Sequence, residues 1–199
     1  MTYKVYGMVQ SRAFRVLWLL EELGLDYEHV PAGPHSAEIK SVSALGKVPA
    51  LVDGDTVITD SSAILTYLAD KHGAFTAPAG SKARARQDSW TFRILDEIES
   101  QLWTASKHSF VLPEAERVAE VKPSCKAEYV RNLERIMAEL EGDYLMGDAF
   151  SVPDIILGHC GGWARNAGFP DGPDAFGAYL KRLRARPAFR AAVSAGQKG

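Results

Sequence analysis

The chain has 199 residues, of which 46% are hydrophobic and 24% charged, and its formal net charge is −2. This composition is that of a folded globular chain, so it excludes general disorder and argues against a nucleic-acid ligand. We find no apolar stretch long enough to span a bilayer and no basic segment leading into one, so we expect a cytoplasmic protein without a membrane partner. Cys125 and Cys160 form no short motif, which predicts neither a disulfide framework nor a metal site.

The N-terminal part of the chain alternates between strand and helix patterns. Residues 3–6 predict a strand that is closed by Gly7. Apolar residues on one face of residues 12–23 predict a helix that ends at Gly24. Residues 27–30 predict a second strand, which completes a βαβ unit if the two strands are parallel.

The next segments predict a short helix at 37–42, a hairpin over 50–58 with an Asp-Gly turn, and a helix over 61–71. This order of elements is that of a thioredoxin-like α/β domain, although other small α/β folds share the same periodicity. Residues 74–80 contain Pro78 and have the composition of a linker.

The rest of the chain predicts helices only. Apolar residues recur at helical spacing in two long segments, which predicts an antiparallel pair and the start of a bundle: Trp90, Ile94, Ile98, Leu102 and Tyr129, Leu133, Met137. Ser151 and Asp154 predict a capped helix start, and residues 175–186 predict a helix that Pro187 stops. We therefore expect two domains, 1–77 and an all-helical 78–199.

Four stretches of the sequence, in this order and spacing, carry a family resemblance: residues 11–28, 46–51 with 60–64, 144–155, and 186–189. Together the chain resembles the cytosolic glutathione transferases, in particular their bacterial, serine-using, theta- or phi-like branch. The resemblance implies the glutathione transferase fold, a thioredoxin-like N-terminal domain followed by an all-α domain. It also implies a homodimer, because the helix from Trp90 to Leu102 resembles the family's subunit contact.

Some positions differ from the family pattern. Ser43 and Ala44 stand where many members have Asn-Pro, and Asp60 stands where Glu or Gln is commoner. Residues 8–11 hold no cysteine, although the cysteine-using branches have one there. Cysteine-based chemistry at this position is therefore not expected.

The resemblance implies that glutathione is the co-substrate and that no metal is needed. A cis Val48-Pro49 bond would aim the main-chain N–H and C=O of Val48 at the tripeptide, as an added strand would. Asp60 and Ser61 begin a helix, where Ser61 would hold the γ-glutamyl carboxylate, but simple N-capping by the same residues is compatible. Lys47 would pair with a ligand carboxylate, or it is merely solvated.

Two residues compete to activate the glutathione thiol. Ser11 lies at the loop-to-helix junction, where its hydroxyl and the helix N-terminus would stabilise a thiolate, although it would also serve as a plain cap. Tyr6 has the spacing of the tyrosine-using branches, but strand aromatics are usually core. We therefore assign Ser11 as the catalytic residue and Tyr6 as the rival. His35 lies in a loop that contacts the glycine end of glutathione in some members.

The function predicted from the resemblance is conjugation of glutathione to a small apolar electrophile held between the domains. Trp103, His108 and Trp163 would line that second pocket, although at least two of them are expected to be core. Two alternatives stay open: disulfide reduction, peroxide reduction or isomerisation at the same site, or a non-catalytic binding protein that retains the fold.

Overall fold

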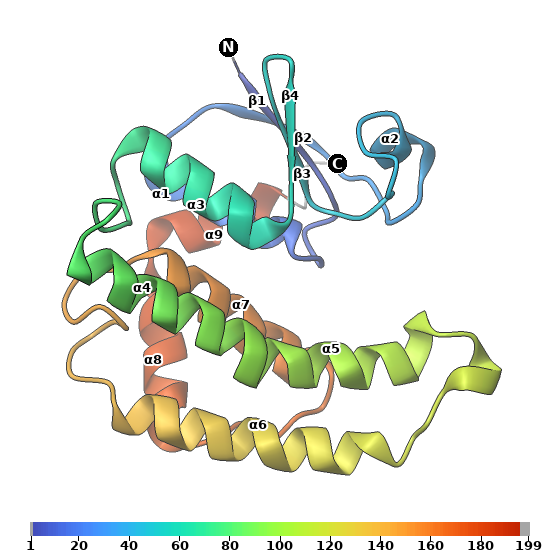
Figure 1. The fold of residues 1–199 in the computed structure, drawn as a ribbon, viewed down its shortest axis with the longest axis vertical. Helices are drawn as coiled ribbons and strands as arrows, with labels where there is room; N and C mark the ends of the chain where they lie inside the picture. Colours follow the sequence, from blue (N-terminus) through green and yellow to red (C-terminus); the bar gives the residue numbers. More distant parts are fainter. Residues whose placement is uncertain (1, 196–199) are drawn as a thin grey trace. The chain divides into compact units, whose positions relative to one another are not determined.

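The computed structural model describes residues 2–195, which divide into two compact units (Figure 1). Unit 1 is the described part of Met1–Ala79 together with that of Arg184–Gly199. Unit 2 is Gly80–Leu183. A single boundary after residue 77 therefore does not describe these units, because the end of the chain returns to unit 1.

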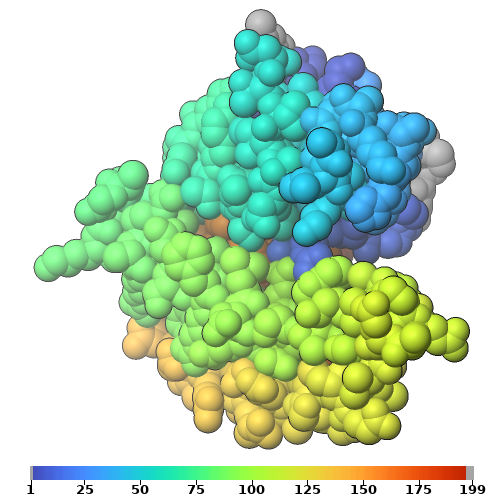
Figure 2. All heavy atoms as spheres, turned by 45° about the vertical axis from the view of Figure 1, so that its right-hand side comes forward, coloured from blue at the N-terminus to red at the C-terminus, as the bar shows by residue number. Residues whose placement is uncertain are grey.

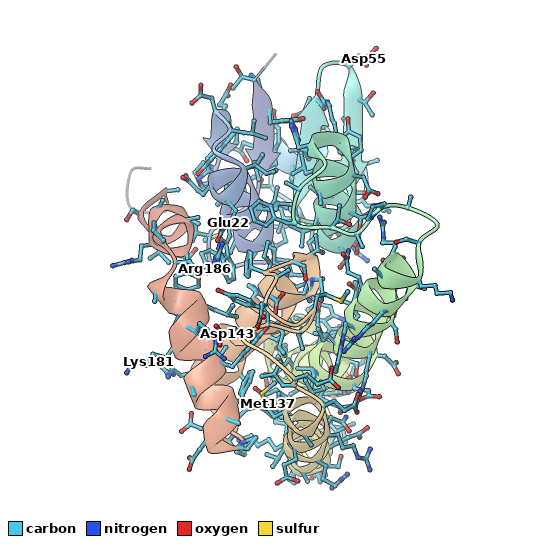
Figure 3. All side chains as sticks on the ribbon, turned by 90° about the vertical axis from the view of Figure 1, so that its left-hand side faces the viewer. Glu22, Asp55, Met137, Asp143, Lys181 and Arg186 are labelled. Carbon is cyan, nitrogen blue, oxygen red and sulfur yellow. The ribbon has the colours of Figure 1, made fainter. Side chains whose placement is uncertain are left out.

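Unit 1 is built on a four-stranded sheet in the order β2-β1-β3-β4. The strands are β1 (Tyr3–Tyr6), β2 (Tyr27–Val30), β3 (Ala50–Asp53) and β4 (Thr56–Thr59). β1 pairs parallel to β2 and antiparallel to β3, and β3 and β4 form an antiparallel hairpin. The two-residue turn is Gly54-Asp55 rather than Asp53-Gly54, and Gly54 takes the left-handed φ of 63° that such a turn needs. Asp55 marks the hairpin tip in Figure 3.

Helices cover both faces of this sheet. α1 (Ala13–Leu23) and α3 (Ser61–His72) pack against one another on one face. α1 contacts β1 and α3 contacts β3, and Val5 and Leu51 of these two strands are fully buried. On the other face, Ile39 of the short helix α2 (Ala37–Lys40) packs with Ala32 and Ala50. The resulting order of elements confirms the predicted thioredoxin-like fold.

The last helix, α9 (Pro187–Ala195), packs against α1 within unit 1. The Phe189 ring lies 5.2 Å from that of Phe14 and 4.9 Å from that of Trp18, both edge to face. Arg186 donates two hydrogen bonds to the Glu22 carboxylate at 2.6 and 2.7 Å (Figure 3). The helix expected over 175–186 is α8 (Asp174–Ala185), so its predicted stop ahead of Pro187 is confirmed. The sequence did not show that Pro187 also begins α9, although proline suits the first position of a helix, where its missing N–H has no intrahelical partner.

Unit 2 is helical, and none of its described residues belongs to the sheet. Its long first helix consists of α4 (Lys82–Arg93), the π-helical segment η1 (Ile94–Glu99), α5 (Ser100–Ser106) and the π-helical turn η2 (Lys107–Val111). α6 (Val121–Ala138) packs along α5, as the two apolar repeats predict. Asn132 of α6 donates to the Glu97 carbonyl at 2.9 Å, which satisfies a main-chain group in the wider η1 turns.

α7 (Val152–Asn166) begins with the predicted capping box of Ser151 and Asp154. The buried Asp154 carboxylate also accepts from the Leu145 N–H at 2.9 Å and from the Tyr179 hydroxyl at 2.7 Å. Tyr179 belongs to α8 (Asp174–Ala185), so this one carboxylate joins α7, α8 and the loop before α7. Burial raises the pKa of Asp154, while its hydrogen bonds act in the opposite direction.

Short elements complete unit 2. The turn η3 (Glu114–Glu116) lies between η2 and α6, in a yellow-green end that projects in Figure 2. Phe110, Val111 and Val118 of this end are 70%, 44% and 50% exposed. Among residues 2–195, no helix combines the length and the apolar content that crossing a membrane requires.

Candidate functional site

The candidate site lies at one end of the sheet in unit 1, where β1 ends, β3 begins and β4 ends. Tyr6 pairs with Ala50, and Ala50 pairs with Thr59. α3 follows β4 after Asp60 alone, whereas residues 7–12 join β1 to α1, whose first residue, Ala13, lies beside Gly7. Two helix N-termini therefore lie at this same end. Their partial positive charges favour an anionic ligand.

Gly7 is the point at which the parts of this site come closest. It has a φ of 143°, and a Cβ atom built on it would lie 2.6 Å from the Ala13 Cβ and 3.2 Å from the Val48 Cβ. The Ser11 Oγ lies 3.5 Å from the same point. Only glycine fits here, and the contact brings Ser11 and Val48 together. The Val48-Pro49 bond is cis, as predicted.

Ser61 is 2% exposed, and its Oγ accepts a hydrogen bond from Arg15 Nη1 at 3.1 Å. Arg15 is fully buried, so a cation lies directly behind the Ser61 hydroxyl. A hydroxyl that accepts from a guanidinium keeps its own proton to donate to an anion. The sequence analysis missed Arg15, although a lone charge within the apolar run of residues 13–20 was the available signal.

Asp60 is the N-cap of α3, with a left-handed φ of 70°. Its Oδ1 accepts from the Ser62 N–H at 2.8 Å and from the Ala63 N–H at 3.1 Å. The capping alternative therefore describes this oxygen. The Asp60 side chain thus binds the N–H groups of Ser62 and Ala63 in the first turn of α3, but it does not bind the N–H of Ser61.

Ser11 is half-buried, and its hydroxyl is engaged within its own turn. The Oγ donates to the Met8 carbonyl at 2.6 Å and accepts from the Ala13 N–H at 3.1 Å. The N-cap residue of α1 is Arg12, so Ser11 serves the helix start only by accepting from the N–H of its first residue. To stabilise a thiolate, the hydroxyl proton would have to turn away from Met8.

The rival residue Tyr6 lies on the opposite face of the sheet from Val5. Its ring is half-buried and packs against the cluster of Ala32, Ile39 and Ala50. This is the core position that strand aromatics commonly take.

Lys47 and His35 are exposed in the loops beside Val48. The His35 N–H donates to the Gly46 carbonyl at 2.7 Å, and the His35 ring lies over Gly46. The fold thus brings His35 close to the segment that carries Lys47 and Val48.

The residues predicted to line a second pocket lie in unit 2. The Trp103 and Trp163 rings are 6.5 Å apart, and Trp103 is 37% exposed. His108 Nδ1 accepts from the Val118 N–H at 3.1 Å. None of the three is buried, so the expectation that at least two are core is wrong.

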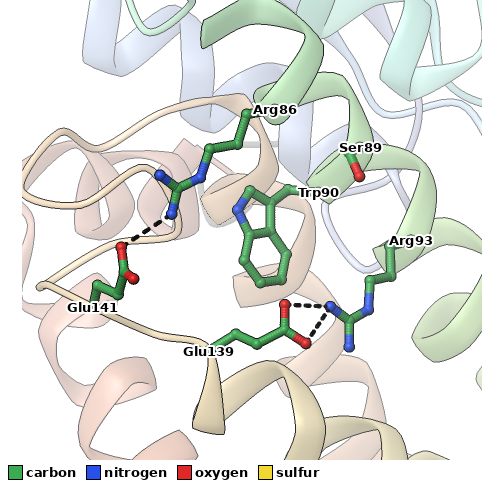
Figure 4. Close-up of a pocket in the computed structure, with 6 residues that line it drawn as sticks. All are labelled: Arg86, Ser89, Trp90, Arg93, Glu139 and Glu141. Atoms are coloured by element: carbon green, nitrogen blue, oxygen red, sulfur yellow. Dashed lines mark hydrogen bonds and ion pairs between the residues drawn. The ribbon is translucent and has the colours of Figure 1, made fainter. Parts of the chain in front are cut away.

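Unit 2 also holds a cavity of about 290 Å³ between α4 and the segment after α6 (Figure 4). It is lined by Arg86, Ser89, Trp90, Arg93, Glu139 and Glu141. Arg93 binds Glu139 at 2.8 Å and Arg86 binds Glu141 at 3.3 Å, so carboxylates balance its cations. Within residues 2–195, no group of three or more His, Cys, Asp or Glu side chains is placed to hold a metal ion.

Comparison with known proteins agrees with this geometry. The sequence profile of the glutathione S-transferase N-terminal domain matches residues 1–70. Glutathione S-transferase 3 of Zea mays is 31% identical, over 96% of this chain and 93% of that protein. A glutathione transferase structure from Methylococcus capsulatus is 30% identical over the whole of both chains, with a TM-score of 0.86. A theta-class glutathione S-transferase from Xanthomonas axonopodis pv. citri, with glutathione bound, is 27% identical over 96% of this chain and 97% of that one, with a TM-score of 0.78.

Proposed function

Because the chain belongs to the glutathione S-transferase family, we propose that it binds reduced glutathione at the end of the sheet in unit 1 and joins the glutathione sulfur to an electrophilic carbon. The observation that carries this proposal is the meeting of Val48, Ser11 and the start of α1 at Gly7, together with the hydrogen bond that Arg15 of α1 donates to Ser61 at the start of α3. This end of the sheet combines the main chain of Val48, the Ser61 hydroxyl hydrogen-bonded to the buried Arg15, and the positive N-terminal ends of α1 and α3.

Each part of glutathione has a partner in this arrangement. The γ-glutamyl carboxylate would accept from the Ser61 hydroxyl and N–H, with Arg15 behind them. The γ-glutamyl ammonium would pair with the carboxylate of Asp60. The peptide groups would pair with the Val48 main chain, and Lys47 would meet the glycine carboxylate.

The thiol lies last in this series, beside Ser11 and the start of α1. A hydrogen bond from the Ser11 hydroxyl, aided by the positive end of α1, stabilises the thiolate over the thiol, and the proton leaves to solvent. The thiolate then attacks the electrophilic carbon. The carbon–sulfur bond forms with the sulfur electron pair, and the leaving group departs with the electrons of the bond that breaks.

The finer parts of this function are also proposals. We infer an apolar electrophile, a homodimer and a cytoplasmic setting. We place conjugation ahead of disulfide reduction, because the cysteines of the chain, Cys125 and Cys160, are buried in unit 2 and Met8 to Ser11 supply no thiol. Glutathione alone would then supply the reactive sulfur.

The test combines binding with two reactions. Calorimetric titration with reduced glutathione measures binding, and parallel assays measure conjugation to a chloronitrobenzene and reduction of a mixed disulfide. We expect binding together with conjugation, and we expect both to weaken in Ser61→Ala. Ser89→Ala, at the cavity of unit 2, is the matched control and should leave both unchanged.

Two results would contradict the proposal. Binding without either reaction would identify a non-catalytic binding protein. Disulfide reduction without conjugation would identify a reductase.

A further inference from the structure

The His29 side chain is hydrogen-bonded to Gly7, at the start of the segment that carries Ser11. It lies in β2, on the sheet face that α1 covers, because its register partner in β1 is the buried Val5. Its Nε2 lies 2.7 Å from the Gly7 carbonyl oxygen. The Gly7 N–H in turn donates to the carbonyl of Val30 at 2.9 Å. Adjacent residues of β2 therefore hold both main-chain polar groups of Gly7.

The hydrogen bond also requires a proton on one particular nitrogen of the ring. A carbonyl oxygen only accepts, so His29 must carry its proton on Nε2 to bind Gly7. Any other tautomer would set two acceptors against each other at this distance. The imidazole therefore acts here as a donor with a defined direction.

Gly7 is the residue whose placement sets the spacing of the site. It contacts Ala13 at the start of α1 and Val48 beside the cis-proline, with Ser11 next to it. These contacts leave no room for a side chain, so a shift of the Gly7 peptide would move Ser11 relative to Val48. We propose that His29 is a positioning residue for thiolate formation, acting through Gly7 on Ser11. This inference rests on the proposed function, in which Ser11 meets the sulfur of a glutathione held by Val48 and Ser61.

The His29 side chain is half-buried. It lines a groove of about 690 Å³ between the end of α1, β2 and α9. The ionisable groups that share this groove are Glu21 and Asp26 from the α1 end and Tyr27 from β2. The Tyr27 hydroxyl donates to Glu21 at 2.7 Å, so those two groups are paired with each other. Substitutions at His29 therefore leave the Tyr27–Glu21 pair in place.

The experiment compares two substitutions at one position. His29→Phe keeps a ring of similar size and removes the donor, whereas His29→Gln keeps an N–H donor near the Nε2 position. The matched control is His72→Phe, since the His72 Nε2 is hydrogen-bonded to the Tyr3 hydroxyl at 2.9 Å at the other end of β1. The readouts are kcat against pH and the KM for glutathione, with a chloronitrobenzene as the electrophile.

For His29→Phe we expect the pH midpoint of kcat to rise by about 0.5 unit or more and kcat at neutral pH to fall about three- to tenfold, the scale of one lost hydrogen bond. The KM for glutathione should stay within about twofold, because the contacts of Val48 and Ser61 lie elsewhere. His29→Gln should restore most of the wild-type profile. His72→Phe should lower thermal stability without moving the midpoint.

A second arm keeps the inference testable if His29→Phe folds poorly. His29→Leu and Ser11→Ala, each alone and both together, form a double-mutant cycle. If His29 acts through Ser11, replacing His29 should add no further midpoint shift when Ser11 is already alanine.

Unchanged midpoints in His29→Phe and His29→Leu, with wild-type conjugation intact, would overturn the inference and leave the proposed function standing. Equal shifts in the His72 control would also overturn it, since they would mark a general effect of instability. A wild-type protein that binds no glutathione would instead remove the proposed function and the inference together.

Discussion

Replacing Ser11 by alanine tests how the thiolate is stabilised. In the free protein the Ser11 hydroxyl donates to the Met8 carbonyl at 2.6 Å, so binding a thiolate exchanges a neutral acceptor for a charged one. Hydrogen bonds contribute about 0.5–1.5 kcal/mol to a neutral partner and about 1.5–3 kcal/mol to a charged one, so the exchange is worth roughly 1–2 kcal/mol. At 1.36 kcal/mol per pKa unit, Ser11→Ala should raise the thiol pKa by about one unit.

The assay is the initial rate of conjugation at saturating glutathione, followed from about pH 5 to about pH 9. The midpoint should move up by about one unit, and the rate well below the midpoint should fall about tenfold. Glutathione affinity should change little, because the binding contacts lie on Val48 and Ser61. Ser11→Thr retains a hydroxyl and should resemble wild type.

The same substitution removes the acceptor of the Ala13 N–H, which costs about 1 kcal/mol of folding stability. The rates must therefore be measured well below the unfolding temperature of the variant. A Ser11→Ala profile that superimposes on wild type, together with a shifted profile in Tyr6→Phe, would refute the assignment of Ser11.

Three further substitutions address binding and stability. Ser61→Ala should weaken glutathione binding about tenfold or more in calorimetry and leave the pH midpoint in place, since it removes one bond to a carboxylate; unchanged affinity would argue against the site. Arg186→Ala should lower the free energy of unfolding in urea by about 1–3 kcal/mol, because it leaves the largely buried Glu22 carboxylate without its bidentate partner. An unchanged urea midpoint of unfolding would show that the ion pair adds nothing to stability. Hydrogen bonds from Lys71 and Tyr67 lower the pKa of Asp53, so the stabilisation that Asp53 provides should be present above the ordinary aspartate pKa and be lost as the pH falls through the lowered pKa. In urea unfolding measured across this acid range, Asp53→Asn should make the free energy of unfolding depend less on pH.

Local patterns predicted most of the secondary structure. The strands at 3–6 and 27–30 match the expected bounds, and the capping box of Ser151 and Asp154 begins α7 as expected. These signals work because the residues that determine each element are neighbours in the chain. The π-helical segment η1, Ile94–Glu99, shows the limit of this approach, since no local signal marked the π-helical turns that follow α4.

Features that depend on distant residues were beyond such patterns. Arg15 and Ser61 are 46 positions apart, and Glu22 and Arg186 are 164 apart. Pro187 follows the end of α8 and begins α9, and the local signal showed only the first of these, because the second helix is held by packing against α1. In the site, the family resemblance supplied the positions of Ser11, Val48 and Ser61, while the hydroxyl directions required coordinates.

Because α9 packs on α1, the ribosome makes the two parts of unit 1 before and after it makes unit 2. Unit 1 is the first to leave the ribosome and the last to be completed, because unit 2 is encoded between its two parts. Until residues 187–195 emerge, the faces of Phe14 and Trp18 that contact Phe189 have no cover from α9. Exposed apolar surface of this kind is where nascent chains associate wrongly or meet chaperones. A fragment that ends at the linker would carry the proposed glutathione contacts together with this uncovered face.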